Sequence, residues 1–235
     1  MSSHLRHKYE RGKYILQKKG LLPFVMEGVR FLSKSVFVYK RYYTYELPLN
    51  GPMQFEPAPR IQNFVFEIVP TNQRLDELAA QGFDFGIHGI RARDKLDKGA
   101  LMFCIFIGKE LACIHWAATT PEAMDMIFRI PYKVDFLNGE VYIGWSETTP
   151  KYKRLGLSQY LIAEKLKLFA TMGKTTGKWT VVKSNRASQR LTIKIGGRIY
   201  GEGSYLKILW WSSWKERSVI QQGGQPQPTE GVGER

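Results

Sequence analysis

The chain has 235 residues, of which 43% are hydrophobic and 13% aromatic, and a formal net charge of +14. This length fits one sizeable domain with extensions, or at most two small domains, and the composition is that of a globular protein. The charge favours an anionic partner: nucleic acid, a phosphate-bearing cofactor or an acidic membrane surface. No run approaches the roughly 18 apolar residues of a membrane span, and the basic N-terminus lacks the apolar segment of a secretory signal. We therefore expect a cytoplasmic protein, either free or in peripheral contact with a membrane.

Residues 1–58 are predicted to form a basic helical extension. Its first 47 residues hold ten Lys or Arg against three Asp or Glu, a net +7. The segment "LLPFVMEGVRFLSKSVFV" is apolar enough to form a helix, "YKRYYTYEL" suits a strand or an extended arm, and "LNGPMQFEPAPR" is a proline-rich connector. The extension could pack with a solvated basic face, or rest on an anionic membrane through residues 1–47. Its interleaved aromatic and basic side chains would also suit nucleic acid, which is the least favoured partner.

One main domain is predicted for residues 59–218, followed by a disordered tail rich in Gln, Gly and Pro at 219–235. Strand and helix patterns both occur in it, as is typical of a mixed domain. The expected elements begin with a strand at 64–69, a helix at 71–82 capped by Thr71, a hairpin at 100–118 around a Gly-Lys-Glu turn and a loop at 119–139. After them come a strand at 140–149, a helix at 156–173, a strand at 178–184, a helix at 185–197 capped by Asn185 or Ser184, and a hairpin at 197–214 that turns at 202–204.

Cysteine and histidine are too sparse for a disulfide framework or a metal centre. The two cysteines, Cys104 and Cys113, flank the predicted hairpin turn and are expected to be reduced, buried thiols. The four histidines include His88 in "FGIHGI", which has no partner at metal-ligand spacing, so we expect no metal.

The stretch "KYKRLGLS", residues 151–158, joins a predicted strand to a predicted helix. Such a junction directs several unpaired backbone amides toward one point, with the positive end of the helix dipole behind them. Gly156 lets the backbone approach a ligand closely, while Lys151, Lys153 and Arg154 would supply countercharge. The residues alone fit either an anion site or an ordinary connector.

Two motifs resemble the GNAT superfamily of acyl-CoA-dependent N-acyltransferases over about residues 61–214. The run "KRLGLS" resembles the family's Arg/Gln-x-x-Gly-x-Gly/Ala loop, and "NRASQRLTIKIGG" is similar to its Asn-x-x-Ala-x-x-Leu-Tyr-x-Lys-x-Gly-Phe helix. The matching positions in the second motif are Asn185, Ser188, Leu191, Lys194 and Gly196. The chain departs from the family at Lys153, Ser158, Thr192 and Gly197. Thr192 stands where the family often has a tyrosine that protonates the leaving thiolate, and Gly197 replaces the usual Phe.

This resemblance implies an α/β (α+β) fold: a GNAT-like mixed, mostly antiparallel central sheet with splayed parallel strands at the cofactor site, flanked by helices. It implies acetyl-CoA or another acyl-CoA as co-substrate, with the pyrophosphate on the amides that follow the strand. The pantetheine arm would then run between residues 140–149 and 179–184, pairing with amides near Glu147 and Thr148. The cofactor-binding residues so implied are Thr148, Lys153, Arg154, Leu155, Gly156, Leu157, Ser158, Asn185 and Ser188.

Acyl transfer to an amine needs a base that removes the amine's proton directly or through water. Glu147 and Glu140 are the candidate carboxylates; their separation of seven places them on opposite faces of a regular strand, unless a bulge intervenes. His115 suits either a core position or a base beside the acceptor. The connection at 119–139, with Arg129 and Asp135, is expected to shape the acceptor pocket.

The sequence thus predicts an N-acyltransferase acting on a primary amine of a small molecule, an amino sugar or a peptide. The alternative is a non-catalytic module on the same fold that binds acyl-CoA or an anionic surface, either membrane or nucleic acid.

Overall fold

The computed structural model describes residues 37–51, 56–128 and 130–218. The helical extension predicted before residue 37, the predicted disorder of the tail and the side chain of Arg129 lie outside the described residues. The strands are β1 Phe37–Pro48, β2 Val65–Val69, β3 Leu101–Ile107, β4 Glu110–Ala118, β5 Glu140–Thr148, β6 Thr176–Val182, β7 Arg198–Ile208 and β8 Trp211–Ser218. The helices are α3 Asn72–Ala80, α4 Ile87–Asp97, α5 Pro121–Ile127, α6 Leu157–Thr171 and α7 Arg186–Lys194, with short 3-10 turns η1 Phe136–Asn138 and η2 Pro150–Tyr152.

The strands form one mixed sheet in the order β2-β3-β4-β5-β6-β1-β7-β8. Strands β5 and β6 run parallel, whereas the pairs β2–β3, β3–β4, β4–β5 and β1–β6 are antiparallel. The predicted fold class, a mostly antiparallel sheet with one parallel pair and flanking helices, is confirmed.

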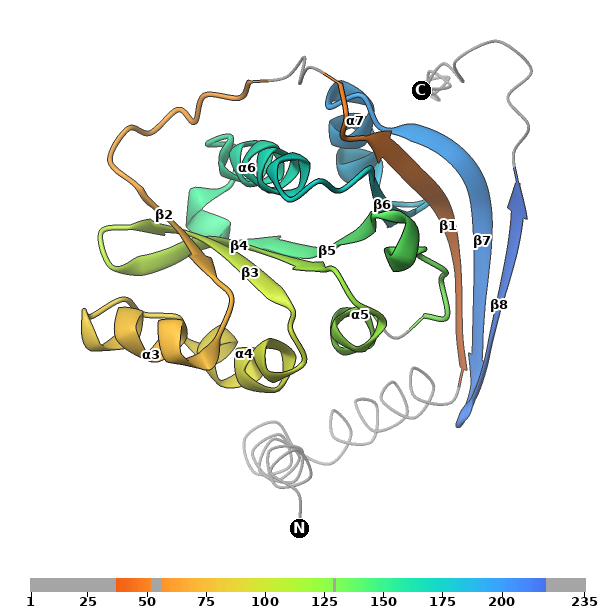
Figure 1. Ribbon diagram of the computed structural model, residues 1–235, viewed down its shortest axis with the longest axis horizontal. Coiled ribbons are helices and arrows are strands. Elements are labelled where there is room, and N and C mark those ends of the chain that lie inside the picture. Colours follow the sequence, from red (N-terminus) through yellow and green to blue (C-terminus); the bar gives the residue numbers. More distant parts are fainter. Residues whose placement is uncertain (1–36, 52–55, 129, 219–235) are drawn as a thin grey trace, which may run out of the picture. The chain divides into compact units, whose positions relative to one another are not determined.

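The chain divides into two compact units. Among the described residues, the smaller unit consists of 37–40 and 204–215, and the larger one holds everything else. Within the larger unit, α6 covers one face of the sheet, and α3, α4 and α5 cover the other (Figure 1). Because helices lie on both faces, β3 and β4 are buried along almost their whole length rather than alternating between buried and exposed residues.

The main core lies between α6 and the sheet. Leu161 and Phe169 of α6 are fully buried there against Phe103, Ala117 and Val141 of the sheet. The apolar spacing that predicted this helix therefore marks the face that packs. Cys104 and Cys113 are both buried and free, as expected from the sequence.

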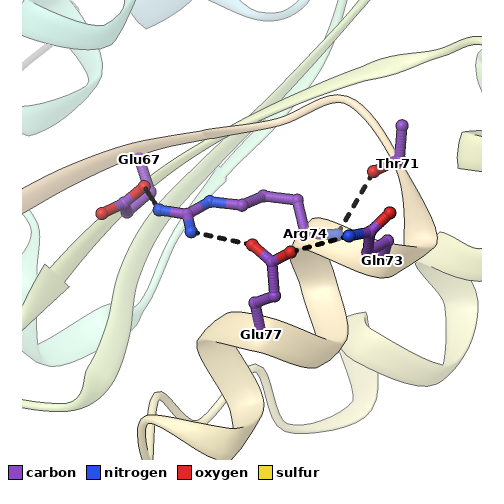
Figure 2. Close-up of polar contacts among 5 residues, drawn as sticks. All are labelled: Glu67, Thr71, Gln73, Arg74 and Glu77. Carbon is purple, nitrogen blue, oxygen red and sulfur yellow. Dashed lines mark hydrogen bonds and ion pairs between the residues drawn. The ribbon is translucent and has the colours of Figure 1, made fainter.

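Helix α3 is tied to the sheet by a small polar network that Figure 2 shows. Its predicted cap is confirmed, because the Thr71 side chain accepts a hydrogen bond from the Arg74 amide at 3.2 Å. The Arg74 guanidinium then bridges two carboxylates, Glu67 on β2 at 2.8 Å and Glu77 on α3 at 3.1 Å. The Arg74 side chain thereby links helix α3 to β2, the strand that precedes it.

Two expectations about local structure were wrong. The closing hairpin turns at Leu209 and Trp210, not at 202–204, because the glycines lie inside β7. A Cβ on Gly201 would stand 2.7 Å from Thr44 Oγ1 and 3.0 Å from Arg217 O, so this glycine serves a close approach of neighbouring chain segments. In addition, the connection at 119–139 is not a plain loop, since Thr120 caps helix α5 within it.

Candidate functional site

The candidate site is built around the divergence of β5 and β6. The two strands are paired only from Glu140↔Thr176 to Tyr142↔Lys178. Beyond that point β5 continues beside β4, whereas β6 pairs with β1 as far as Tyr42↔Val182. The facing edges of the two strands therefore have no ladder partner after Tyr142, and we call the region between these diverging edges the slot. This is the predicted splay.

A β-bulge in β5 changes which carboxylates share a face. Ala117 pairs with Ile143 and His115 with Ser146, so Gly144 and Trp145 together oppose the single residue Trp116. The extra residue places Glu147 on the same face of the sheet as Glu140. The sequence left the shared face open, because it depended on whether a bulge intervened. Gly144 is required at the bulge, because a Cβ there would lie 2.7 Å from Ile127 Cγ2 and 3.1 Å from Trp116 O.

Past the end of β5, the chain forms the predicted strand-to-helix junction at residues 151–158. Gly156 has φ +82° and precedes α6, and Arg154 also has a positive φ of +66°. Within the described residues, none of the backbone amides from Arg154 to Gln159 donates to a protein acceptor. These free N–H groups lie at the positive end of the α6 dipole, where they would suit a phosphate.

The basic side chains of this junction are not equivalent. Lys151 forms an ion pair with Glu110, so the charge of Lys151 is already compensated. The Tyr152 hydroxyl donates to the same carboxylate at 3.1 Å. Lys153 and Arg154 are exposed and have no carboxylate partner in the part of the chain that the structure describes. The unbalanced positive charge beside the free amides therefore comes from these two residues.

The two candidate bases have different surroundings. Glu140 Oε1 lies 2.6 Å from Lys178 Nζ, and Glu140 Oε2 accepts a hydrogen bond from the Asp135 amide at 2.7 Å. Both of its oxygens are thus engaged. Glu147 is exposed and forms no ion pair with any described residue, and it lies close enough to His88 for its charge to raise the pKa of that histidine.

Helix α4 contributes Lys95, which the sequence did not single out, and His88, which it considered only as a metal ligand. The His88 and Trp145 rings have centroids 6.0 Å apart, and Lys95 Nζ lies 4.5 Å from the Trp116 ring centroid and 6.0 Å from that of Trp145. Burial lowers the pKa of Lys95 and also that of His88, an effect that the Glu147 carboxylate opposes. Glu147 thus stands beside an aromatic and cationic wall made by α4 and the bulge.

His115 lies on the opposite face and is a core residue. It is fully buried, its Nε2 lies 3.0 Å from Ser158 Oγ on α6, and burial holds its pKa well below the usual value. The Thr148 hydroxyl likewise lies 3.2 Å from Cys113 Sγ. The side chains of Thr148 and Ser158 are therefore used within the protein, and any contact with a ligand would fall to their backbone amides.

The second motif is placed on the far side of the slot. Asn185 follows β6 and caps α7, its Oδ1 accepting from the Ser188 amide at 3.1 Å. Thr192 is buried, and its hydroxyl accepts a hydrogen bond from Trp179 Nε1 at 3.1 Å. Thr192 therefore faces the interior and offers no acidic hydroxyl to the slot, in agreement with its departure from the family motif.

A pocket of about 470 Å³ lies beside the paired part of β5 and β6. Asp135 and Glu140 lie in its wall, so the predicted acceptor segment does border a hollow. The lining residues are Pro121, Met124, Asp125, Tyr132, Lys133, Val134, Asp135, Phe136, Glu140 and Lys178.

No group of three or more His, Cys, Asp or Glu residues in the described ranges is placed to hold a metal ion. No helix there combines the length and apolarity that crossing a bilayer would require.

Comparisons with known proteins give neighbours by structure but not by sequence. No protein-family model and no curated protein matches the chain. Similar solved structures include a GCN5-related N-acetyltransferase from Sphaerobacter thermophilus, at 14% identity and a TM-score of 0.48, covering 81% of this chain and 56% of that one. Another is a GCN5-related N-acetyltransferase from Kribbella flavida, at 10% identity and a TM-score of 0.46, covering 77% and 63%.

A Drosophila protein is similar at 15% identity and a TM-score of 0.48, covering 80% of this chain and 58% of its own. The chain thus spans less than two thirds of the length of these three neighbours. Two of these three neighbours are GCN5-related N-acetyltransferases.

Proposed function

We propose that the protein is an N-acyltransferase that moves an acyl group from acyl-CoA to a primary amine. The observation that carries the proposal is the continuity of two features: a slot between diverging parallel strands, and free backbone amides from Arg154 to Gln159 where the first strand ends. An acyl-CoA has an extended thiol arm joined to phosphates, so it needs a slot for the arm and free amides for the phosphates where the slot ends.

The residues present fit such a co-substrate. The amides of Leu155, Gly156, Leu157 and Ser158 would bind the pyrophosphate, with Lys153 and Arg154 as countercharges. The backbone near Thr148 and the side chains of Asn185 and Ser188 would contact the arm, because the amides of Asn185 and Ser188 already donate within the protein. Acyl-CoA would supply a thioester, whose acyl carbon bonds to the amine nitrogen as its carbon–sulfur bond breaks. We propose acetyl as the acyl group; a longer chain would have to fit the end of the same slot.

Glu147 is the base that the surroundings favour. An incoming amine is a cation at neutral pH and must lose a proton before it can attack the acyl carbon. Glu147 has no cationic partner among the described residues, whereas both oxygens of Glu140 are already bonded. Glu147 would take the proton directly or through water, and slot-facing amides of β5 would polarise the acyl carbonyl.

The amine would approach Glu147 from the face that α4 and α5 cover. The pocket beside Asp135 and Glu140 lies next to the paired end of the strands, and we propose that it holds the body of the acceptor. The free, buried thiols of Cys104 and Cys113 fit a reducing compartment, and we place the activity in the cytoplasm.

A non-catalytic acyl-CoA-binding module is the second candidate. It is favoured by one observation: Thr192 is buried against Trp179, so no hydroxyl stands where the family has its acid. Cofactor binding alone cannot separate the two candidates, whereas turnover can.

Calorimetry with acetyl-CoA and longer acyl-CoAs tests the cofactor site first. Gly156→Glu adds an acidic side chain at a residue whose own amide is one of the free ones, where a Cβ would stand 3.5 Å from Pro59 Cα and 3.6 Å from Ala58 O, and it should abolish binding by the intact chain. Gly173→Glu is the matched control, because Gly173 also has a positive φ, +70°, and has open space around it at the other end of α6. Absence of binding by the native protein to every acyl-CoA would overturn the proposal.

Thiol release with a panel of amines then tests chemistry. Turnover with any primary amine supports the transferase. Tight binding of acyl-CoA with no thiol release from any amine would favour the non-catalytic module.

A further inference from the structure

The β7–β8 hairpin ends in an exposed apolar tip, Ile208–Trp211, which we name the tryptophan tip. Trp210 is 89% exposed, Trp211 53%, Leu209 45% and Ile208 41%. These residues are consecutive and belong to the smaller unit of the chain. Exposed single apolar residues are common, but a run that includes two tryptophans marks an interaction surface.

The turn itself does not require these side chains. Two-residue hairpin turns favour Asn, Asp or Gly because their backbone needs positive φ, yet Leu209 occupies such a position with φ +54°. Leu209 is therefore a poor residue for the turn, and the exposed side chains of Leu209 and Trp210 are both poorly suited to water. Within the described residues Trp210 has no ring or cation contact that would use its indole.

The surroundings of the tip are aromatic and positively charged. In the same unit, Phe37 is 56% and Tyr39 55% exposed. The described residues of that unit, 37–40 and 204–215, include Lys40, Lys207 and Lys215 but no Asp or Glu. A protein partner of ordinary composition would leave this one-sided charge unbalanced.

We propose that the tryptophan tip docks on the surface of an anionic lipid bilayer. Tryptophan prefers the boundary between acyl chains and headgroups, where its ring is buried and its N–H remains hydrated. Leu209 and Ile208 would add apolar area, and the three lysines would meet anionic headgroups. The tip provides a docking surface in addition to the basic segment 1–47 that the sequence suggested, and it does not depend on the proposed acyltransferase activity.

Vesicle binding by the full-length chain tests the proposal. The probes are vesicles of phosphatidylcholine alone and of equal parts phosphatidylcholine and phosphatidylglycerol, with the bound fraction measured by flotation. The variant Trp210→Ser/Trp211→Ser should bind the anionic vesicles at least about tenfold more weakly than the native chain, because it loses the inserted aromatic area. Ile90→Ser is the matched control, since Ile90 is 79% exposed on α4 in the larger unit, and its binding should be unchanged.

Three results would overturn the proposal. The first is equal binding of the double variant and the native chain, which would assign membrane contact to the N-terminal basic segment. The second is no binding of the native chain to anionic vesicles. The third is that the native chain forms a dimer, that the double variant does not, and that the monomer does not bind lipid. This result would mean that the tip contacts a second copy of the chain. Stronger binding to anionic than to neutral vesicles, weakened by salt and by Lys207→Ser, supports it.

Discussion

Glu140 and Lys178 form an ion pair, Oε1 to Nζ at 2.6 Å, within the short stretch where β5 and β6 are still paired. Their side chains are 16% and 17% exposed, so the pair is largely shielded from water. The pair spans the two strands just before they diverge, and the second Glu140 oxygen holds the Asp135 amide of the preceding connection. Glu140 therefore fixes the closed end of the slot, and Glu147 remains available for chemistry.

Exchanging each glutamate for glutamine separates these roles. Glu147→Gln should lower kcat by about 10²–10⁴-fold while leaving acetyl-CoA affinity unchanged, because it removes a proton acceptor and no cofactor contact. Glu140→Gln should keep most of the turnover but cost about 2 kcal/mol of unfolding free energy, since it leaves Lys178 without its counterion in a shielded site. Steady-state kinetics and urea unfolding measure the two effects. The opposite pattern, with turnover lost only in Glu140→Gln, would assign the base to Glu140.

The proximity of Glu147 to His88 can be checked without any turnover. Burial lowers the pKa of His88, and the Glu147 carboxylate raises it, while Lys95 lowers it. Glu147→Gln should therefore lower the His88 pKa further, and Lys95→Met should raise it. An NMR titration of the histidine ring protons measures both shifts. Glu140→Gln is the control. If Glu147→Gln leaves the His88 pKa unchanged, the bulge does not direct the Glu147 side chain toward α4.

A buried lysine should make the stability of the fold depend on pH. Lys165 is fully buried on α6, its Nζ has no hydrogen-bond partner among the described residues, and burial lowers its pKa from 10.5 to about 7. The unfolded chain therefore binds the proton more tightly than the folded one between about pH 7 and 10.5. The native chain should gain stability as the pH rises through that window, because the cost of removing the lysine's proton on folding becomes smaller.

Lys165→Met keeps the length of the side chain and removes the charge. It should stabilise the protein at pH 7 on the order of a few kcal/mol and bring much less benefit at pH 9.5, where the unfolded chain also begins to lose the proton. Urea unfolding at the two pH values gives the comparison. Lys167→Met, on the exposed side of the same helix, is the control. A gain from Lys165→Met that is equal at both pH values would mean that Lys165 is not buried as a neutral amine.

Sequence patterns predicted the elements whose periodicity is strong and whose ends carry caps. The β3–β4 hairpin, α6 and the Thr71 and Asn185 caps fall where the sequence placed them. Helix α4 was missed because its N-cap, Gly86, makes no side-chain capping bond and its polar residues hide the apolar stripe. Because α4 was missed, the sequence could not place His88 and Lys95 beside Glu147.

The bulge in β5 could not be predicted from the sequence either, although it decides which face of the sheet Glu140 and Glu147 occupy. It depends on the close approach of Ile127 to Gly144, two residues that are distant along the chain. The predicted turn of the closing hairpin is wrong for a related reason. Glycine often marks a turn, whereas Gly201 permits a close contact inside a strand. Tertiary contacts of this kind leave no local pattern.

The departures from the family motif at Thr192 and Gly197 are explained by one side chain. Trp179 fills the space beside both residues, donating to the Thr192 hydroxyl at 3.1 Å, and a Cβ on Gly197 would stand 2.8 Å from Trp179 Cζ2 and from Thr192 Cγ2. Gly197→Ala should therefore cost about 1–3 kcal/mol of unfolding free energy, because the tightly packed side chains must shift. Gly51→Ala, where nothing lies within 4 Å and φ is not positive, is the matched control and should stay within about 0.5 kcal/mol of the native chain. In a Thr192→Ser background, which lacks the colliding methyl group, the cost of Gly197→Ala should shrink; an undiminished cost would show that the Thr192 methyl does not limit the space at position 197.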